Sequence, residues 1–93
     1  MTRCRVGGRC LCGCVMFEYE GTPNWILHCH CESCRRATSS PMTTWISVAR
    51  NDFFLTKGLP RYFSPSAGVR RGFCETCGSP LTYESERVPD EVH

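Results

Sequence analysis

Seven of the nine cysteines in this chain of 93 residues fall into three tight groups. The groups are Cys10-Leu11-Cys12, Cys29-His30-Cys31-Glu32-Ser33-Cys34 and Cys74-Glu75-Thr76-Cys77. Cysteines separated by one or two residues can bring two thiolates to one metal ion, and zinc favours such ligands. A single core in so short a chain is marginal without a metal, disulfides or a partner. We therefore expect the cysteines, and not the apolar core, to determine the fold.

Three features favour metal ligation over disulfide bonding. The number of cysteines is odd, and Cys10 and Cys12 are too close in the sequence to bridge each other without strain. The first eight residues contain no apolar stretch typical of a signal peptide, and no later segment approaches the length of a membrane span. We expect a cytoplasmic protein that does not enter a membrane and whose thiols stay reduced.

The charge of the chain argues against a nucleic-acid partner. Its formal net charge is +2, and its eleven basic residues are spread along the sequence except for the doublets Arg35-Arg36 and Arg70-Arg71. A nucleic-acid footprint needs a basic face, so we do not expect a zinc-ribbon protein that binds DNA or RNA. The doublets can instead receive the carboxylates of a small anion. The sequence does not indicate an oligomeric state.

The organisation of the chain is that of one all-β domain over residues 1–93. No repeat, low-complexity tract or linker divides it, and turn signals recur every eight to twelve residues. Segments rich in β-branched and aromatic residues predict short strands between turns such as Ser64-Pro65-Ser66, and the aromatic side chains are expected in the core. The segment 32–38 alone looks helical. The predicted strands cover residues 15–20, 25–29, 42–48, 53–56, 61–63, 69–73 and 81–83.

The first and third cysteine groups together provide a closed tetrahedral site that suits a structural zinc ion. Its four ligands would be Cys10, Cys12, Cys74 and Cys77. In a strand, the two residues of a C-x-C pair project to one face, whereas a C-x-x-C turn carries its thiolates around a bend. Gly13 and Gly78 directly follow the two pairs, where such a turn needs a positive φ. Folding and metal binding should be inseparable, because this site would join the beginning of the domain to its end.

The middle group provides three thiolates, Cys29, Cys31 and Cys34. Three protein ligands and one open position are typical of a catalytic zinc ion, at which water or a substrate thiolate takes the fourth place. Two alternatives are compatible with the spacing. The first cysteine pair can combine with two of these three, and His28 or His30 can complete a second structural site.

Two further cysteines, Cys4 and Cys14, lie outside the three groups. Cys14 continues the i, i+2 series of the first pair, but Gly13 is expected to turn the chain before it, which leaves Cys14 as a buried free thiol. Cys4 is expected to be a solvent-exposed thiol near the terminus.

The three groups and their flanking residues resemble the signatures of a known family. They read Gly8-Arg9-Cys10-Leu11-Cys12-Gly13, then His28-Cys29-His30-Cys31-Glu32-Ser33-Cys34-Arg35-Arg36, then Gly72-Phe73-Cys74-Glu75-Thr76-Cys77-Gly78-Ser79-Pro80-Leu81. They are similar to the G-x-C-x-C-G, C-H-C-x-x-C-R and G-F-C-x-x-C-G-x-x-L motifs of the glutathione-dependent formaldehyde-activating enzyme family, which also contains centromere protein V. The resemblance runs in order over residues 8–92.

The resemblance implies a small β-tent of antiparallel sheets stapled by two zinc ions. It also implies a division of the ligands: Cys10, Cys12, Cys74 and Cys77 bind the structural ion, and Cys29, Cys31 and Cys34 bind a catalytic one. In the named enzyme, the second zinc is the proposed centre that joins formaldehyde to the thiol of glutathione, giving S-hydroxymethylglutathione. Carried over, the chain is a carbon–sulfur lyase for an aldehyde and a thiol such as glutathione. The ion acts as the electrophilic centre, with no side-chain general base.

The end of the chain departs from the family pattern. Family members usually continue beyond the position of His93, and residues 89–93 look like the approach to a strand that the chain does not contain. We therefore expect a fold truncated at its C-terminus, with part of the wall of the second site missing. The alternative is a non-catalytic zinc-binding module for protein interaction, which predicts a second zinc ion with four protein ligands or no second ion.

Overall fold

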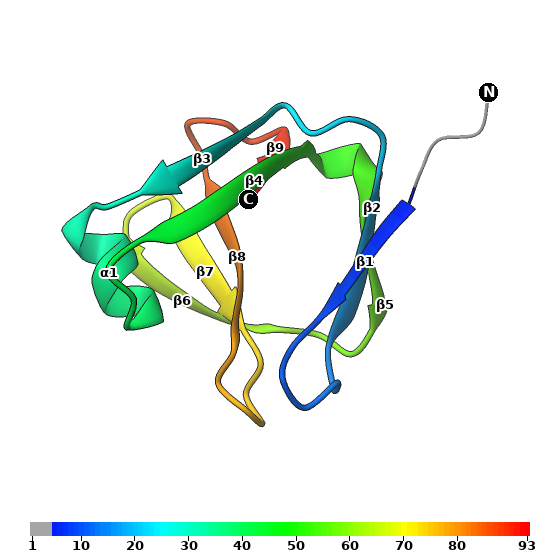
Figure 1. The fold of residues 1–93 in the computed structure, drawn as a ribbon, viewed down its shortest axis with the longest axis horizontal. Coiled ribbons are helices and arrows are strands. Elements are labelled where there is room, and N and C mark those ends of the chain that lie inside the picture. Colours follow the sequence, from blue (N-terminus) through cyan, green and yellow to red (C-terminus); the bar gives the residue numbers. More distant parts are fainter. Residues whose placement is uncertain (1–4) are drawn as a thin grey trace.

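The computed structural model describes residues 5–93. The expected all-β class is confirmed, because nine strands within this range form three antiparallel sheets, accompanied by one α-helix. The three sheets stand as the walls of a small tent, with α1 beside the wall that contains β3 and β4 (Figure 1). The elements are β1 (Arg5–Arg9), β2 (Met16–Glu20), β3 (Trp25–Cys29), α1 (Glu32–Thr38), β4 (Thr43–Ala49), a 3-10 turn (Arg50–Asp52), β5 (Phe53–Lys57), β6 (Arg61–Ser66), β7 (Val69–Phe73), β8 (Pro80–Ser85) and β9 (Glu91–Val92).

Two hairpins of this fold carry cysteine pairs at their tips. The strand orders of the three sheets are β1-β2-β5, β3-β4-β9 and β6-β7-β8. In the first sheet Arg9 lies opposite Met16, so the loop 10–15 closes the hairpin of β1 and β2. In the third sheet Phe73 lies opposite Pro80, so the loop 74–79 closes the hairpin of β7 and β8. The first and third cysteine groups therefore occupy loops at the ends of two different walls.

The predicted elements agree with the structure except at the strands β1, β6 and β9. The segments 25–29, 32–38 and 69–73 coincide with β3, α1 and β7. The strand β1 was not expected from its sequence, which is poor in residues that favour strands, and it forms as the partner of β2. The strand β6 continues through Ser64-Pro65-Ser66, where a turn was expected. This edge strand tolerates Pro65 because its pairing with β7 shifts register between Phe63 and Ser66.

The tail of the chain contains a short strand, β9, which the sequence did not predict within residues 89–93. Val92 of β9 lies opposite Val48 of β4. The next residue, His93, exchanges two backbone hydrogen bonds with Tyr83 of β8, at 2.8 and 3.0 Å between nitrogen and oxygen. The tail thus ties the sheet that contains β4 to the strand β8 of another sheet.

Buried side chains gather around the first and third cysteine groups. Cys10, Val15 and Cys74 form a cluster in which each side chain is at most 3% exposed, and Cys77 and Leu81 pack against it. The expectation that the aromatic side chains form the core is wrong for several of them. The exposed aromatic residues are Phe54, Tyr62 and Phe63.

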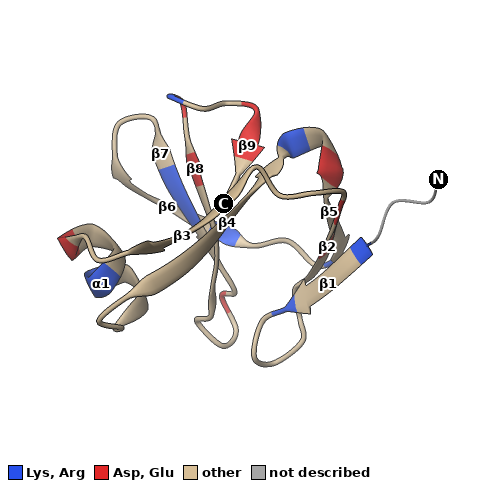
Figure 2. Cartoon of the chain, turned by 45° about the horizontal axis from the view of Figure 1, so that its top comes forward, with Lys and Arg blue, Asp and Glu red and all other residues tan. Residues whose placement is uncertain are grey.

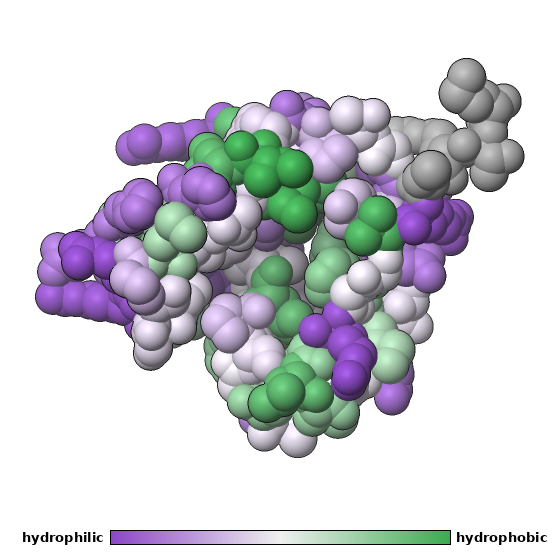
Figure 3. All heavy atoms as spheres, viewed as in Figure 1, coloured by the Kyte–Doolittle hydropathy of each residue, from purple (hydrophilic) through white to green (hydrophobic). Residues whose placement is uncertain are grey.

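The space between the three walls is a cavity of about 320 Å³ lined mostly by apolar side chains. Phe17 of β2 and Phe53 of β5 line it with their rings stacked 5.6 Å apart, and Trp45 of β4 and Leu81 of β8 line it from the other two walls. The surface is hollowed near the centre of the view in Figure 3, where apolar side chains are visible. The walls therefore meet around a partly open interior.

A buried carboxylate joins two of the walls. The side chain of Glu84 on β8 is 9% exposed and accepts hydrogen bonds from Arg50 Nη1 at 2.6 Å and from Arg70 Nε at 2.7 Å. Basic β7 and acidic β8 lie side by side in Figure 2. Burial opposes ionisation, but the two arginines outweigh it and hold the pKa of Glu84 below its ordinary value. The ion pairs fix the turn after β4 against the β7–β8 hairpin.

No helix within residues 5–93 combines the length and the apolar character that crossing a membrane requires.

Candidate metal centres

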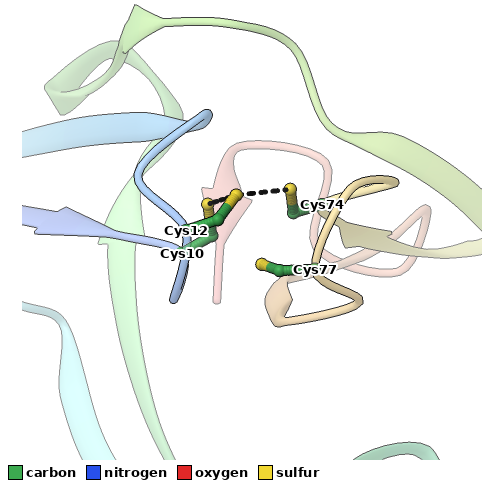
Figure 4. Close-up of side chains that lie close together, drawn as sticks. All are labelled: Cys10, Cys12, Cys74 and Cys77. Carbon is green, nitrogen blue, oxygen red and sulfur yellow. Dashed lines mark hydrogen bonds between the residues drawn. The ribbon is translucent and has the colours of Figure 1, made fainter.

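The loops at the tips of two hairpins bring four thiols together. The Sγ atoms of Cys10, Cys12, Cys74 and Cys77 all lie within 4.8 Å of one another (Figure 4). The Sγ atom of Cys12 is 3.6 Å from that of Cys10 and 3.7 Å from that of Cys74. Four thiolates at the zinc–sulfur distance of about 2.3 Å in a tetrahedron have sulfur atoms about 3.8 Å apart. This cluster, which we call the long-range cluster, therefore has a spacing close to that of a four-thiolate metal site.

The two loops of the long-range cluster have matching backbone hydrogen bonds. In the first, the N–H of Cys10 donates to the carbonyl of Val15 at 3.0 Å, and the N–H of Gly13 donates back to the carbonyl of Cys10 at 3.2 Å. In the second, the N–H of Cys74 donates to Ser79 at 3.0 Å and that of Gly78 donates to Cys74 at 2.7 Å. Gly13 and Gly78 have φ values of +81° and +78°, as their positions after the cysteine pairs predicted.

Hydrogen bonds to sulfur favour the thiolate form of two cysteines in the long-range cluster, Cys10 and Cys77. The N–H of Val15 donates to Sγ of Cys10 at 3.3 Å. The hydroxyl of Ser79 lies 3.2 Å from Sγ of Cys77 and, as the largest cause, lowers the pKa of Cys77 to about 5. The N–H of Leu11 also donates to the Ser79 hydroxyl at 3.0 Å, which connects the two loops directly. Each loop thus provides one sulfur atom whose surroundings favour the anionic form.

The expected strand geometry of the first cysteine pair is wrong. Cys10 follows the end of β1, and Cys12 lies in the turn that leads toward β2, so a turn brings both thiols to the cluster. The same turn leaves Cys14 exposed, where a buried thiol was expected. Cys4, expected to be an exposed thiol, lies outside the described residues.

The middle group also forms a cluster, within a single short segment. Cys29 ends β3, Cys31 is the N-cap of α1, and Cys34 lies in the first turn of the helix. The Sγ atom of Cys29 is 3.3 Å from the Sγ atoms of both Cys31 and Cys34. The N–H of Cys34 donates to Sγ of Cys31 at 3.3 Å, so the sulfur atom replaces the usual oxygen of a helix cap. We call this group the local cluster.

The local cluster contains three ligand atoms among the described residues, and neither neighbouring histidine belongs to it. The ring of His28 is hydrogen-bonded through Nδ1 to the hydroxyl of Thr44 on β4 at 2.9 Å. His30 is exposed. The pairing of the first cysteine pair with the middle group is likewise not observed, because Cys10 lies with the third group. Of the arrangements compatible with the spacing, the structure contains the three-thiol one.

An arginine from another sheet completes the surroundings of the local cluster. Arg71 of β7 donates from Nη2 to the hydroxyl of Ser33 at 3.0 Å and to Sγ of Cys34 at 3.7 Å. Burial of Cys34 opposes ionisation, but the hydrogen bonds from Arg71, Cys31, Cys29 and Trp45 together outweigh it and lower the pKa of Cys34 to about 7. The sequence placed Arg71 only among four arginines that can bind a small anion. Its contact with Cys34 arises from the packing of two sheets, which no spacing in the sequence reveals.

A cavity of about 240 Å³ adjoins the local cluster. Aromatic side chains from three strands form much of its wall, and the guanidinium of Arg71 lies 4.9 Å from the ring centre of Tyr83. Such a site has room for a small ligand between apolar walls and a few polar groups. The residues that line it are Trp25, Leu27, Cys29, Cys31, Ser33, Cys34, Trp45, Arg71, Tyr83 and His93.

Comparisons with known proteins identify a family and a relative of the chain. The profile of the family described as "Glutathione-dependent formaldehyde-activating enzyme" matches residues 5–93. An uncharacterized lyase of Schizosaccharomyces pombe is 29% identical to the chain over 76 residues, which make up 82% of this chain and 55% of the relative. The chain therefore spans about half the length of this curated relative.

Proposed function

The chain belongs to the glutathione-dependent formaldehyde-activating enzyme family, and from this premise we propose that it is a zinc-dependent carbon–sulfur lyase. The proposed reaction joins formaldehyde or a related aldehyde to a thiol such as glutathione. The observation that carries the proposal is the local cluster, whose three thiols adjoin a cavity of about 240 Å³. The matched relative is also named a lyase.

We propose different roles for the two clusters. The long-range cluster holds a structural zinc ion, since four cysteines complete its coordination and two of them are nearly fully buried. The local cluster holds the catalytic zinc ion with Cys29, Cys31 and Cys34 as ligands and leaves one coordination position for a substrate. A zinc ion there supplies Lewis acidity and favours the thiolate form of a bound thiol.

The residues around the local cluster support this chemistry. Three thiolates on a divalent zinc ion would leave one net negative charge. Arg71, which donates a hydrogen bond to Cys34, would offset that charge. The rings of Trp45 and Tyr83 form apolar parts of the cavity wall, where electrostatic interactions are stronger than in water. The cavity holds the thiol and the aldehyde close together, which favours their addition. In the addition, the thiolate sulfur bonds to the carbonyl carbon, and the π electrons pass to the oxygen, which takes up a proton.

Three further proposals concern the domain organisation, the location and the partners of the protein. We propose a single domain over residues 1–93, a cytoplasmic location and no nucleic-acid partner. The family match over residues 5–93 supports the first point, and the small net charge of +2 supports the last.

The test begins with metal content per chain, followed by glutathione titration of the cobalt-substituted protein. We expect two ions, one of which changes its visible spectrum on addition of glutathione, and formation of S-hydroxymethylglutathione when formaldehyde follows. Cys34→Ser should abolish the spectral change, whereas Cys14→Ser, which replaces an exposed thiol outside both clusters, should not. One ion without a glutathione response would favour the non-catalytic zinc module.

A further inference from the structure

A histidine on the tail of the chain is held firmly in the wall of the cavity beside the local cluster. The side chain of His93 is 10% exposed. Its ring lies 4.7 Å from that of Trp25 on β3 and 5.8 Å from that of Tyr83 on β8, in the second case nearly parallel at 12°. All three rings line the cavity that contains Cys29, Cys31 and Cys34. The ring of His93 is therefore confined next to the proposed reaction site.

A chain of hydrogen bonds orients this ring. Nε2 of His93 lies 3.3 Å from Oε1 of Glu91. The other ring nitrogen, Nδ1, makes no hydrogen bond with Glu91. The hydroxyl of Ser47, which is fully buried, donates to the same carboxylate oxygen. Nδ2 of Asn24 donates to the Ser47 hydroxyl at 3.2 Å. The hydrogen bond from Ser47 also lowers the pKa of Glu91, which keeps it a carboxylate.

The pairing of a histidine with a fixed carboxylate is typical of a base that takes and returns a proton. The titratable or charged groups around the ring are Glu91 on its own strand, Tyr83 on β8, Arg71 across the cavity and the three cysteines. Arginine stays protonated, and the cysteines are committed as ligands in the proposed function. Among the described residues that line this cavity, His93 thus offers a ring nitrogen that can accept and then donate a proton.

We infer that His93 is a catalytic residue, acting as the proton carrier of the proposed addition, with Glu91 as its positioning residue. His93 takes the proton that the thiol loses when it becomes a thiolate. After the sulfur has bonded to the carbonyl carbon, His93 returns this proton to the oxygen that received the π electrons. No proton is gained or lost over the cycle. The inference rests on the proposed function and replaces the expectation that no side-chain base takes part.

The test counts the protons released when glutathione binds to the zinc-loaded chain without aldehyde. Calorimetric titrations at about pH 8, where an ordinary imidazole is neutral, are repeated in buffers of different ionisation enthalpy. In the unaltered chain we expect almost no proton to reach the buffer, because His93 keeps it. His93→Phe, which preserves an aromatic ring between Trp25 and Tyr83, and His93→Gln should each release about one proton per thiol bound. The matched control, His28→Gln, should behave as the unaltered chain.

A second measurement needs no substitution. The ring nitrogens of His93 in the ¹⁵N-labelled chain should change from neutral to imidazolium shifts when glutathione is added. Equal proton release by the unaltered and His93 variants, or an unchanged ring, would overturn the role of His93 and leave the proposed function standing. Absence of glutathione binding by the unaltered chain would overturn both.

Discussion

The two cysteine clusters differ in the chain separation of their ligands, and this difference predicts unequal costs of losing them. Cys12 and Cys74 are 62 residues apart in the chain, whereas Cys29 and Cys34 are five apart. The free-energy cost of closing a loop of n residues grows as (3/2)RT ln n. Assembling the long-range cluster therefore costs an unfolded chain about 2 kcal/mol more than assembling the local cluster. In the unfolded chain, the local cluster therefore keeps a higher affinity for metal than the long-range cluster does. Metal bound at the local cluster thus stabilises the folded state less.

We therefore expect Cys74→Ser to destabilise the protein more than Cys34→Ser does, by at least about 2 kcal/mol. In a domain of this size, that difference lowers the midpoint of thermal unfolding by a further ~8 to 16 °C. Cys34→Ser should remain folded with one metal ion fewer per chain. The assay is thermal unfolding followed by circular dichroism, with metal content measured on the same samples and Cys14→Ser as the control. Equal losses of stability in the two variants would refute this reasoning.

Three further predictions concern residues that are not ligands of either cluster. Glu84→Gln should lower the free energy of unfolding by about 2 kcal/mol at neutral pH, because it weakens two charge-assisted ion pairs. Since folding depresses the pKa of Glu84, its contribution is present above the ordinary carboxyl pKa and is lost as the pH falls through the folded value. Urea unfolding curves of the two proteins should thus converge in acid, and a constant difference would contradict the prediction. Arg71→Gln should release cobalt from the local cluster at higher pH, because Arg71 lowers the pKa of Cys34; an unchanged pH profile of the thiolate absorption would count against this. Gly58→Ala should lower stability by about 2 kcal/mol or more, because φ is +65° and the added methyl would meet a carbonyl of the β1–β2 loop. Gly78→Ala, at φ +78° with open space, should cost less in the same thermal unfolding assay.

Local spacing made much of the site predictable from the sequence. The ligands of the local cluster lie within six residues, and the segment's strand, cap and helix follow from its own residues. The spacing also allowed the first cysteine pair to combine with the middle group, so the grouping of the long-range cluster was expected from the family resemblance and not from spacing alone. The exposure of Cys14 was not predictable, because it depends on how the whole loop turns and not on the i, i+2 series.

The residues that surround the clusters could not be predicted, because tertiary packing alone brings them there. Arg71 reaches Cys34 from another sheet, at a separation of 37 residues. His93 enters the cavity wall because β9 pairs with β4 and because its backbone binds Tyr83. The tail has too few strand-forming residues to indicate either contact. Edge position likewise decides that Pro65 belongs to a strand and that Phe63 faces solvent.

The separation of the cluster ligands also sets an order of events during protein synthesis. A chain leaves the ribosome from its N-terminus, so the local cluster is complete as soon as Cys34 has emerged. Cys10 and Cys12 emerge earlier still, yet they must wait for Cys77 before their site can close. During that interval, the thiols of Cys10 and Cys12 in the nascent chain have no partner thiols from the third cysteine group. The local cluster can therefore assemble before the long-range cluster, which needs loops from two distant parts of the chain.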